Sequence, residues 1–115
     1  MQQYGKQQGV WVTMTRMAAN ESKKCLNLSH NSIYAGDEFK RFRDRHLDIC
    51  LHAGVDPEQL TFDMNRRMVR FKSGGFIEFL HLESNLRGRN WNTWSGDPER
   101  PIDERKLSEI EARMR

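Results

Sequence analysis

The chain has 115 residues, of which 37% are hydrophobic and 30% are charged, and its formal net charge is +3. This length and composition suit one domain with one core, and they exclude global disorder and a membrane-spanning segment. The two cysteines have no CxxC or Cys/His ligand spacing, which predicts free thiols in a reducing compartment. We therefore expect a single cytoplasmic domain over residues 1–115, in the host cytoplasm if the protein is viral, with no membrane contact.

The N-terminal region predicts a flexible start, a strand and a helix. Residues 1–8 are polar and Gln-rich, so we expect them to be flexible. Residues 10–15 are β-branched and aromatic, which is typical of a strand. Residues 16–30 then indicate a helix, although the asparagines in this segment weaken the interpretation.

The helix predicted over residues 37–53 has a clearer amphipathic pattern. Asp37 is placed to cap its first turn, and Gly54 is placed to end it. Apolar side chains recur on one face, and Leu47 and Leu51 broaden this stripe. We expect the stripe to pack against one face of a sheet.

A β-hairpin is the strongest structural signal in the sequence. Residues 60–64 predict a strand, Asn65-Arg66 a turn, and residues 67–72 a second strand. Ser73-Gly74-Gly75 supplies the positive φ angles of a tight turn. Residues 76–83 form the returning strand, and their near-continuous apolar run predicts burial on both faces.

The C-terminal region predicts a loop followed by a helix. Residues 85–101 are rich in Gly, Asn, Pro and Arg, which is typical of a long loop, with one short strand around residues 91–94. A helix is expected from Pro101-Ile102-Asp103 onward. Together the elements predict an α+β fold, with a small antiparallel sheet centred on the β-hairpin and packed by two or three helices.

No catalytic, metal or cofactor motif is recognisable. The sequence has no GxSxG elbow, no GxxxxGK[ST] phosphate loop and no HxxxH or HxH spacing. We therefore expect a non-enzymatic protein with no catalytic residue, no metal ligand and no cofactor.

A basic block gives the candidate binding residues. Residues 66–72 hold four basic side chains and no acid, and Arg70 and Lys72 share one face of the predicted hairpin. If the following loop folds beside that face, cations and aromatic rings lie together, as they do where proteins bind single-stranded nucleic acid. The candidate residues are Arg66, Arg67, Arg70, Lys72, Arg87, Arg89, Trp91 and Trp94. The alternatives are a solvated sheet face with both tryptophans in the core, and a patch that binds a protein partner.

Part of this region resembles a known family. Residues 67–79, followed by Asn85-Leu86-Arg87-Gly88-Arg89 and then Asp97, are similar to the middle of viral terminase large subunits and related P-loop ATPases. In those motors a hairpin with a glycine turn precedes an LRG-type segment, and a hydrophobic strand then ends in an acidic Walker B pair. Residues 10–15 and the helix after them similarly resemble the element that follows the phosphate loop of that family.

The sequence also departs from that family. The phosphate loop and its lysine are missing, residues 91–96 are polar for a Walker B strand, and Pro98 separates Asp97 from Glu99. The resemblance therefore implies a cut-down relative that does not hydrolyse ATP on its own.

These observations lead to three functional expectations. The first is a small binding protein, for example a viral or phage one, that acts on nucleic acid or on a protein of a nucleic-acid machine. The second is an inhibitor or adaptor that docks on a larger host or viral complex through the same loop. The third is a degenerate P-loop ATPase-like module related to terminases.

Overall fold

The computed structural model describes residues 2–96 and 101–115, residues 2–7 by their backbone alone. The elements in chain order are α1 (Gln2–Glu21), β1 (Lys24–Ser29), α2 (Ser32–Ala53), the 3-10 helix η1 (Pro57–Gln59), β2 (Leu60–Asp63), β3 (Met68–Phe71), β4 (Phe76–His81), β5 (Thr93–Ser95) and α3 (Glu104–Ala112). The predicted α+β class is confirmed. None of the helices in the described part of the chain combines the length and apolar composition needed to cross a membrane.

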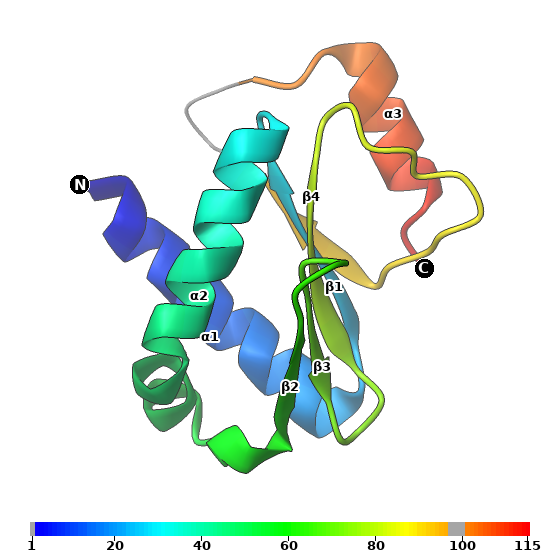
Figure 1. Cartoon of the computed structure of the whole chain (residues 1–115). Helices are drawn as coiled ribbons and strands as arrows, with labels where there is room; N and C mark the ends of the chain where they lie inside the picture. The colour runs from blue at the N-terminus through cyan, green and yellow to red at the C-terminus, as the bar shows by residue number, and fades with distance from the viewer. Residues whose placement is uncertain (1, 97–100) are drawn as a thin grey trace.

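The sheet is mixed, with strand order β2-β3-β4-β1-β5 (Figure 1). The hairpin strands β2, β3 and β4 are antiparallel, as the sequence predicts. The purely antiparallel sheet is nevertheless a wrong prediction, because β1 runs parallel to both β4 and β5. This difference arises at β1, which comes from a segment predicted as helix, and α2 provides part of the long connection that parallel strands require.

The N-terminal strand predicted over residues 10–15 is wrong, because this segment lies inside α1. Residues 2–8, expected to be flexible, form the start of the same helix. Trp11, Met14 and Ala18 are buried at a spacing of three and four residues, so they share one helix face. Burial of that face therefore outweighs the strand propensity of the β-branched residues in this segment.

The helix predicted over residues 16–30 is also wrong in its second half, where β1 forms. Five of the six residues of β1 are buried, as befits a strand with neighbours on both edges and cover on both faces. Asn27 accepts a hydrogen bond from Nε1 of Trp11 at 3.0 Å and donates one to Oε1 of Glu38 at 2.6 Å. An asparagine that weakens the helix prediction is therefore a buried link between β1, α1 and α2.

The helix predicted over residues 37–53 is confirmed as α2, but it starts earlier. Asn31 is the N-cap, and its side chain accepts a hydrogen bond from the backbone N–H of Tyr34. Asp37, predicted as the cap, lies in the second turn. The predicted end is confirmed, because Gly54 adopts a left-handed conformation with φ of 71°.

Helices α1 and α2 cover one face of the sheet, where they bury a large aromatic core. The rings of Trp11, Phe42 and Phe79 meet edge to face, with centroids 5.6 to 6.1 Å apart. Leu47 and Leu51 do not broaden the buried stripe of α2, since they are 64% and 76% exposed.

On the opposite face, α3 and the loop after β4 cover only the half that contains β1 and β5. Leu26, Leu86, Trp91 and Ile110 form the buried cluster there. The other half of this face, over β3 and β4, holds a pocket instead.

The turn between β3 and β4 is tied to the end of α1. A Cβ at Gly75 would collide with the carbonyl oxygen of Ala18, so only glycine fits there. Oγ of Ser73 donates a hydrogen bond to the same oxygen at 2.6 Å, and the N–H of Phe76 donates one to the carbonyl of Lys23 at 3.1 Å. These contacts fix the register of β4 against β1.

Candidate functional site

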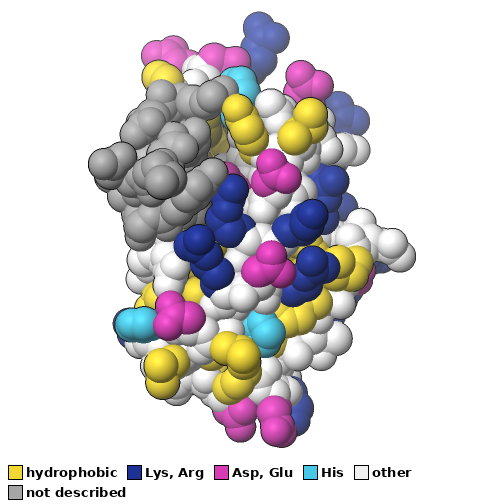
Figure 2. Space-filling view, turned by 60° about the vertical axis from the view of Figure 1, so that its left-hand side comes forward, with side chains coloured by type: hydrophobic (Ala, Val, Ile, Leu, Met, Phe, Trp, Pro, Cys, Tyr) yellow, Lys and Arg dark blue, Asp and Glu magenta, His cyan; other side chains and the backbone are white. Residues whose placement is uncertain are grey.

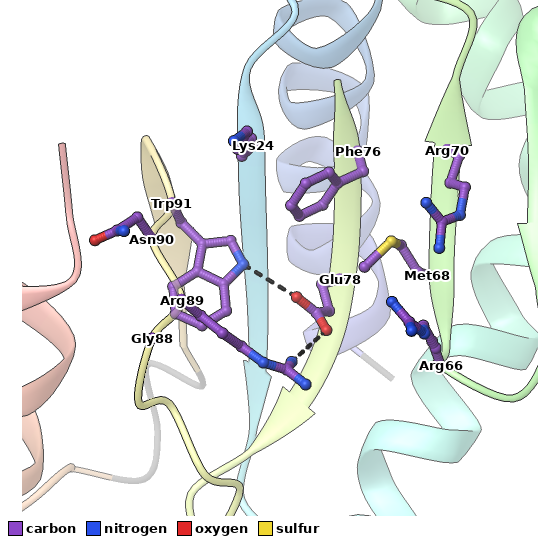
Figure 3. Close-up of a pocket in the computed structure, with 10 residues that line it drawn as sticks. All are labelled: Lys24, Arg66, Met68, Arg70, Phe76, Glu78, Gly88, Arg89, Asn90 and Trp91. Atoms are coloured by element: carbon purple, nitrogen blue, oxygen red, sulfur yellow. Dashed lines mark hydrogen bonds and ion pairs between the residues drawn. The ribbon is translucent and has the colours of Figure 1, made fainter. Parts of the chain in front are cut away.

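The pocket on the β3 and β4 half of the sheet has a volume of about 370 Å³ (Figure 3). Its side chains form two rows across the strands. In the first row, Phe76 of β4 lies between Lys24 of β1 and Arg70 of β3. In the second row, Glu78 of β4 lies between Leu26 of β1 and Met68 of β3. Alternation along each strand therefore brings a ring, a carboxylate and cations to one face.

Glu78 is a buried carboxylate on the floor of the pocket. Its side chain is 6% exposed, and it is held by two donors from the loop after β4. The Arg89 guanidinium donates to Oε2 at 2.6 Å, and Nε1 of Trp91 donates to Oε1 at 3.3 Å. The ion pair with Arg89 compensates the burial of the charge, and both donors fix the orientation of the carboxylate.

Asp63 organises the opposite rim. Its carboxylate accepts a hydrogen bond from the backbone N–H of Arg66 at 3.1 Å and forms an ion pair with the Arg70 guanidinium at 3.2 Å. The backbone hydrogen bond and then Arg70 hold the pKa of Asp63 below its ordinary value. The Asp63 carboxylate therefore stays charged at neutral pH and orients Arg70 beside the pocket.

The pocket is strongly cationic. Lys24, Arg66, Arg70 and Arg89 line it, and Glu78 is the one carboxylate among its described lining residues. Arg89 pairs with Glu78, and Arg70 pairs with Asp63 outside the lining. Neither Lys24 nor Arg66 forms an ion pair with any side chain that the structure describes. These two cations are therefore the ones that an anionic ligand meets without displacing a partner.

Four of the predicted site residues meet at this pocket, namely Arg66, Arg70, Arg89 and Trp91. The other four lie outside its lining. Arg67 turns toward α2, where its guanidinium donates to the carbonyl oxygen of Ser32 at 2.9 Å. Lys72 and Arg87 are exposed, and Trp94 is partly buried against the cluster under α3.

The nucleic-acid hypothesis places the rings of Trp91 and Trp94 at the surface, whereas the alternative places both in the core. For Trp91 the structure agrees with the alternative. Its side chain is 1% exposed and packs against Leu86 and Ile110, because the loop after β4 folds down onto the sheet. Only its Nε1 edge reaches the carboxylate of Glu78. The aromatic ring that borders the pocket with partial exposure belongs to Phe76.

Sequence reasoning missed Lys24, Phe76 and Glu78 as site residues. Lys24 lies in a segment that the sequence predicts as helix. Phe76 lies in an apolar run that predicts a strand buried on both faces. The alternation of residues in the hairpin placed Arg70 correctly on the face opposite Val69 and Phe71. The same alternation, continued through the glycine turn, could have placed Phe76 and Glu78 beside Arg70.

Cations also occur on the helical side, but there they alternate with acids. On the side that Figure 2 turns toward the viewer, Lys and Arg side chains lie interspersed with Asp and Glu. Exposed Lys40, Asp44, Arg45 and Asp48 of α2 contribute to this pattern. Charges of both signs on one surface mainly favour solubility, so the pocket is the stronger candidate for an anion site.

The cysteines do not provide a reactive thiol. Burial, and to a lesser degree the nearby Glu21, raises the pKa of Cys25 to about 12. Burial also raises the pKa of Cys50 above its ordinary value. Both thiols are therefore protonated at neutral pH, whereas nucleophilic catalysis requires the thiolate.

No protein-family model, no curated protein and no solved structure matches this chain. The similarity of residues 67–89 to the middle of the terminase large subunit therefore stays a prediction. The geometry of the pocket is the basis on which a function can be assigned.

Proposed function

We propose that this protein binds nucleic acid through the pocket on the β3 and β4 half of its sheet. The observation that carries the proposal is the gathering of four cations around one pocket, whose described lining holds a single, internally paired carboxylate. Nucleic-acid phosphates are the polyanions that such clusters recognise, and each contact releases counterions from the strand. A net charge of +3 for the whole chain is compatible with this partner.

The cations divide into two pairs with different roles. Arg70 and Arg89 are held by Asp63 and Glu78, so their guanidinium groups are oriented before a ligand arrives. Preorganised donors lose less entropy when they bind. Lys24 and Arg66 are exposed and form no ion pair with a side chain that the structure describes, so they supply most of the attraction for phosphate.

The test is the salt dependence of binding to a fluorescein-labelled single-stranded oligonucleotide, followed by anisotropy. We expect wild-type affinity to fall steeply between about 50 and 200 mM salt. The double variant Lys24→Gln/Arg66→Gln should bind more weakly and show a shallower slope. Each lost phosphate contact should reduce the slope of log K against log salt by about 0.7 for a single strand.

A matched control is the double variant Lys40→Gln/Arg105→Gln. It removes the same charge from exposed positions on α2 and α3, neither of which belongs to the lining of the pocket. It should keep the wild-type slope. Equal losses in both double variants, or no binding by the wild type at about 50 mM salt, would refute the proposal. Capture of a protein complex that survives nuclease would instead favour the adaptor.

A relation to P-loop ATPases is a second candidate, and one observation favours it. Strand β5 follows the Leu86-Arg87-Gly88-Arg89 segment, runs parallel to β1 and ends two residues before Asp97. The resemblance places the strand of the acidic pair at this point, although Asp97 itself lies outside the described residues. Because a fold-level analogy does not establish activity, the test is a thermal shift with ATP and magnesium, alongside a phosphate-release assay.

A further inference from the structure

We infer that the pocket holds one unpaired base of a single strand, and that it prefers guanine. This inference rests on the nucleic-acid binding proposed above and goes further, because it assigns a role to the apolar and acidic groups of the pocket. Phosphate binding alone needs only cations. Phe76, Met68 and Glu78 also line this pocket, and none of them can attract a phosphate.

The position of Phe76 is suited to base stacking. Its ring is partly exposed at the pocket, with Lys24 beside it on β1 and Arg70 beside it on β3 (Figure 3). A base that stacks on this ring would have Lys24 on one side and Arg70 on the other. The phosphates on either side of that base would then lie near these two cations. Aromatic stacking between flanking cations is the recurring arrangement of single-strand binding.

The size of the pocket favours one nucleotide over a duplex. A volume of about 370 Å³ lies near the lower end of the range of about 300–1,000 Å³ for small-ligand pockets. A stacked base in a duplex is not accessible to such a pocket, whereas unstacked bases of single strands can be read along their edges. The ligand is therefore a single strand, with one base inserted.

The preference for guanine follows from Glu78. An ionised carboxylate only accepts hydrogen bonds and has about four lone-pair sites. Arg89 and Trp91 use one on each oxygen, so acceptor capacity remains for a ligand in the pocket. The Watson–Crick edge of guanine presents two adjacent donors, N1–H and the N2 amino group. The corresponding edges of adenine, cytosine and thymine place an acceptor beside the donor, and that acceptor would face the carboxylate.

The test compares oligothymidylates that carry one central guanine, adenine, cytosine or abasic site, with the wild-type protein at constant salt. We expect the guanine oligonucleotide to bind about ten-fold more tightly than the adenine one, and the abasic one to bind most weakly. Glu78→Gln keeps the shape of the side chain but replaces one acceptor with a donor, so the guanine-to-adenine ratio should fall to about one.

A second variant tests the stacking step separately. Phe76→Leu should reduce affinity for the guanine oligonucleotide by about five-fold or more relative to the abasic one, which is the lower end of the effect of one stacked base. Phe62→Leu is the control, because Phe62 is partly buried on the helical face of the sheet. It should leave the oligonucleotide series unchanged. Thermal melting of each variant shows whether it is folded.

The outcomes separate this inference from the proposed function. Steep salt dependence with equal affinity for all five oligonucleotides, including unmodified oligothymidylate, would overturn the base pocket and leave phosphate binding standing. Absence of binding to every oligonucleotide would overturn both. If Glu78→Gln does not fold, the wild-type base series and Phe76→Leu still decide the question. A guanine preference that Glu78→Gln retains would overturn the role of the carboxylate.

Discussion

The two faces of the sheet both contain buried side chains, but helices close one face, whereas the other is partly open at a pocket. On the helical face, β3 and β4 contribute Val69, Phe71, Ile77 and Phe79 to a core closed by α1 and α2. Polar groups on this face pair internally, as Asn27 does with Trp11 and Glu38. On the opposite face, the alternate residues of the same strands line a pocket open to solvent.

Burial alone does not distinguish the two faces. Glu78 and Phe79 are neighbours on β4 and are 4% and 1% exposed. Phe79 is surrounded by other rings, whereas Glu78 is held by a guanidinium and an indole N–H beside the pocket. Side chains that alternate along β4 therefore have different roles: those on the helical face stabilise the fold, and those on the opposite face are available to contact a ligand.

The largest expected effect compares two phenylalanines of β4. Phe79→Ala should cost about 3–5 kcal/mol of unfolding free energy, because it leaves a cavity in the aromatic core. Phe76→Ala should cost about 1–2 kcal/mol, because its ring is only partly buried and borders open space. Urea unfolding followed by fluorescence measures both. Equal costs would show that the two faces are equally packed and contradict the comparison.

The next effect concerns the glycine turn, whose contacts with the end of α1 fix the register of β4 against β1. Gly75→Ala should cost about 1–3 kcal/mol, because the new Cβ would overlap the carbonyl oxygens of Ala18 and Lys23. Gly9→Ala is the control, and its effect on the unfolding free energy should have the opposite sign. Gly9 lies in α1 with no neighbour near the added Cβ, so this variant should gain about 0.5–1 kcal/mol from helix propensity. Thermal unfolding of both variants, with circular dichroism, measures the difference.

The sequence predicts the C-terminal two thirds of the fold better than its start. The hairpin, its glycine turn and the end of α2 at Gly54 depend on local residues, so their signals are local. The segment over residues 10–30 has no such punctuation, since β-branched residues lie in a helix and one asparagine, Asn27, lies in a strand. Burial against distant elements decides these structures, as when Trp11 packs on Phe42 and Phe79. Local sequence signals do not reveal such contacts.

The candidate site likewise contains residues that the local sequence predicts and residues that only long-range contacts bring to the pocket. Arg66 and Arg70 could be predicted because they belong to the hairpin itself. Lys24 reaches the pocket only because β1 pairs with β4 across about fifty residues of chain, in a register fixed at Gly75. The burial of Trp91 depends on α3, which lies further along the chain than the pocket residues.

The smallest expected effect is at the rim of the pocket, where the ion pair of Asp63 with Arg70 is partly exposed. The folded state lowers the pKa of Asp63, so its contribution to stability is present above the unfolded-state pKa of about 3.9. That contribution should be lost as the pH falls through the lower folded-state pKa. At pH 7, Asp63→Asn should therefore be slightly less stable than the wild type, and the difference should shrink toward zero near pH 2.

Urea unfolding at intervals between pH 7 and pH 2 measures this difference, with Asp44→Asn as the control for removing a carboxylate from α2. A difference that stays constant across this range would mean that Asp63 acts through its shape and hydrogen bonds rather than its charge. In that case Arg70 would be less firmly oriented by its partner than its 3.2 Å ion pair implies. Packing, rather than an ion pair, would then position Arg70 on the open face, just as packing positions the aromatic rings on the helical face. The two faces would differ less in the forces that hold their side chains in place.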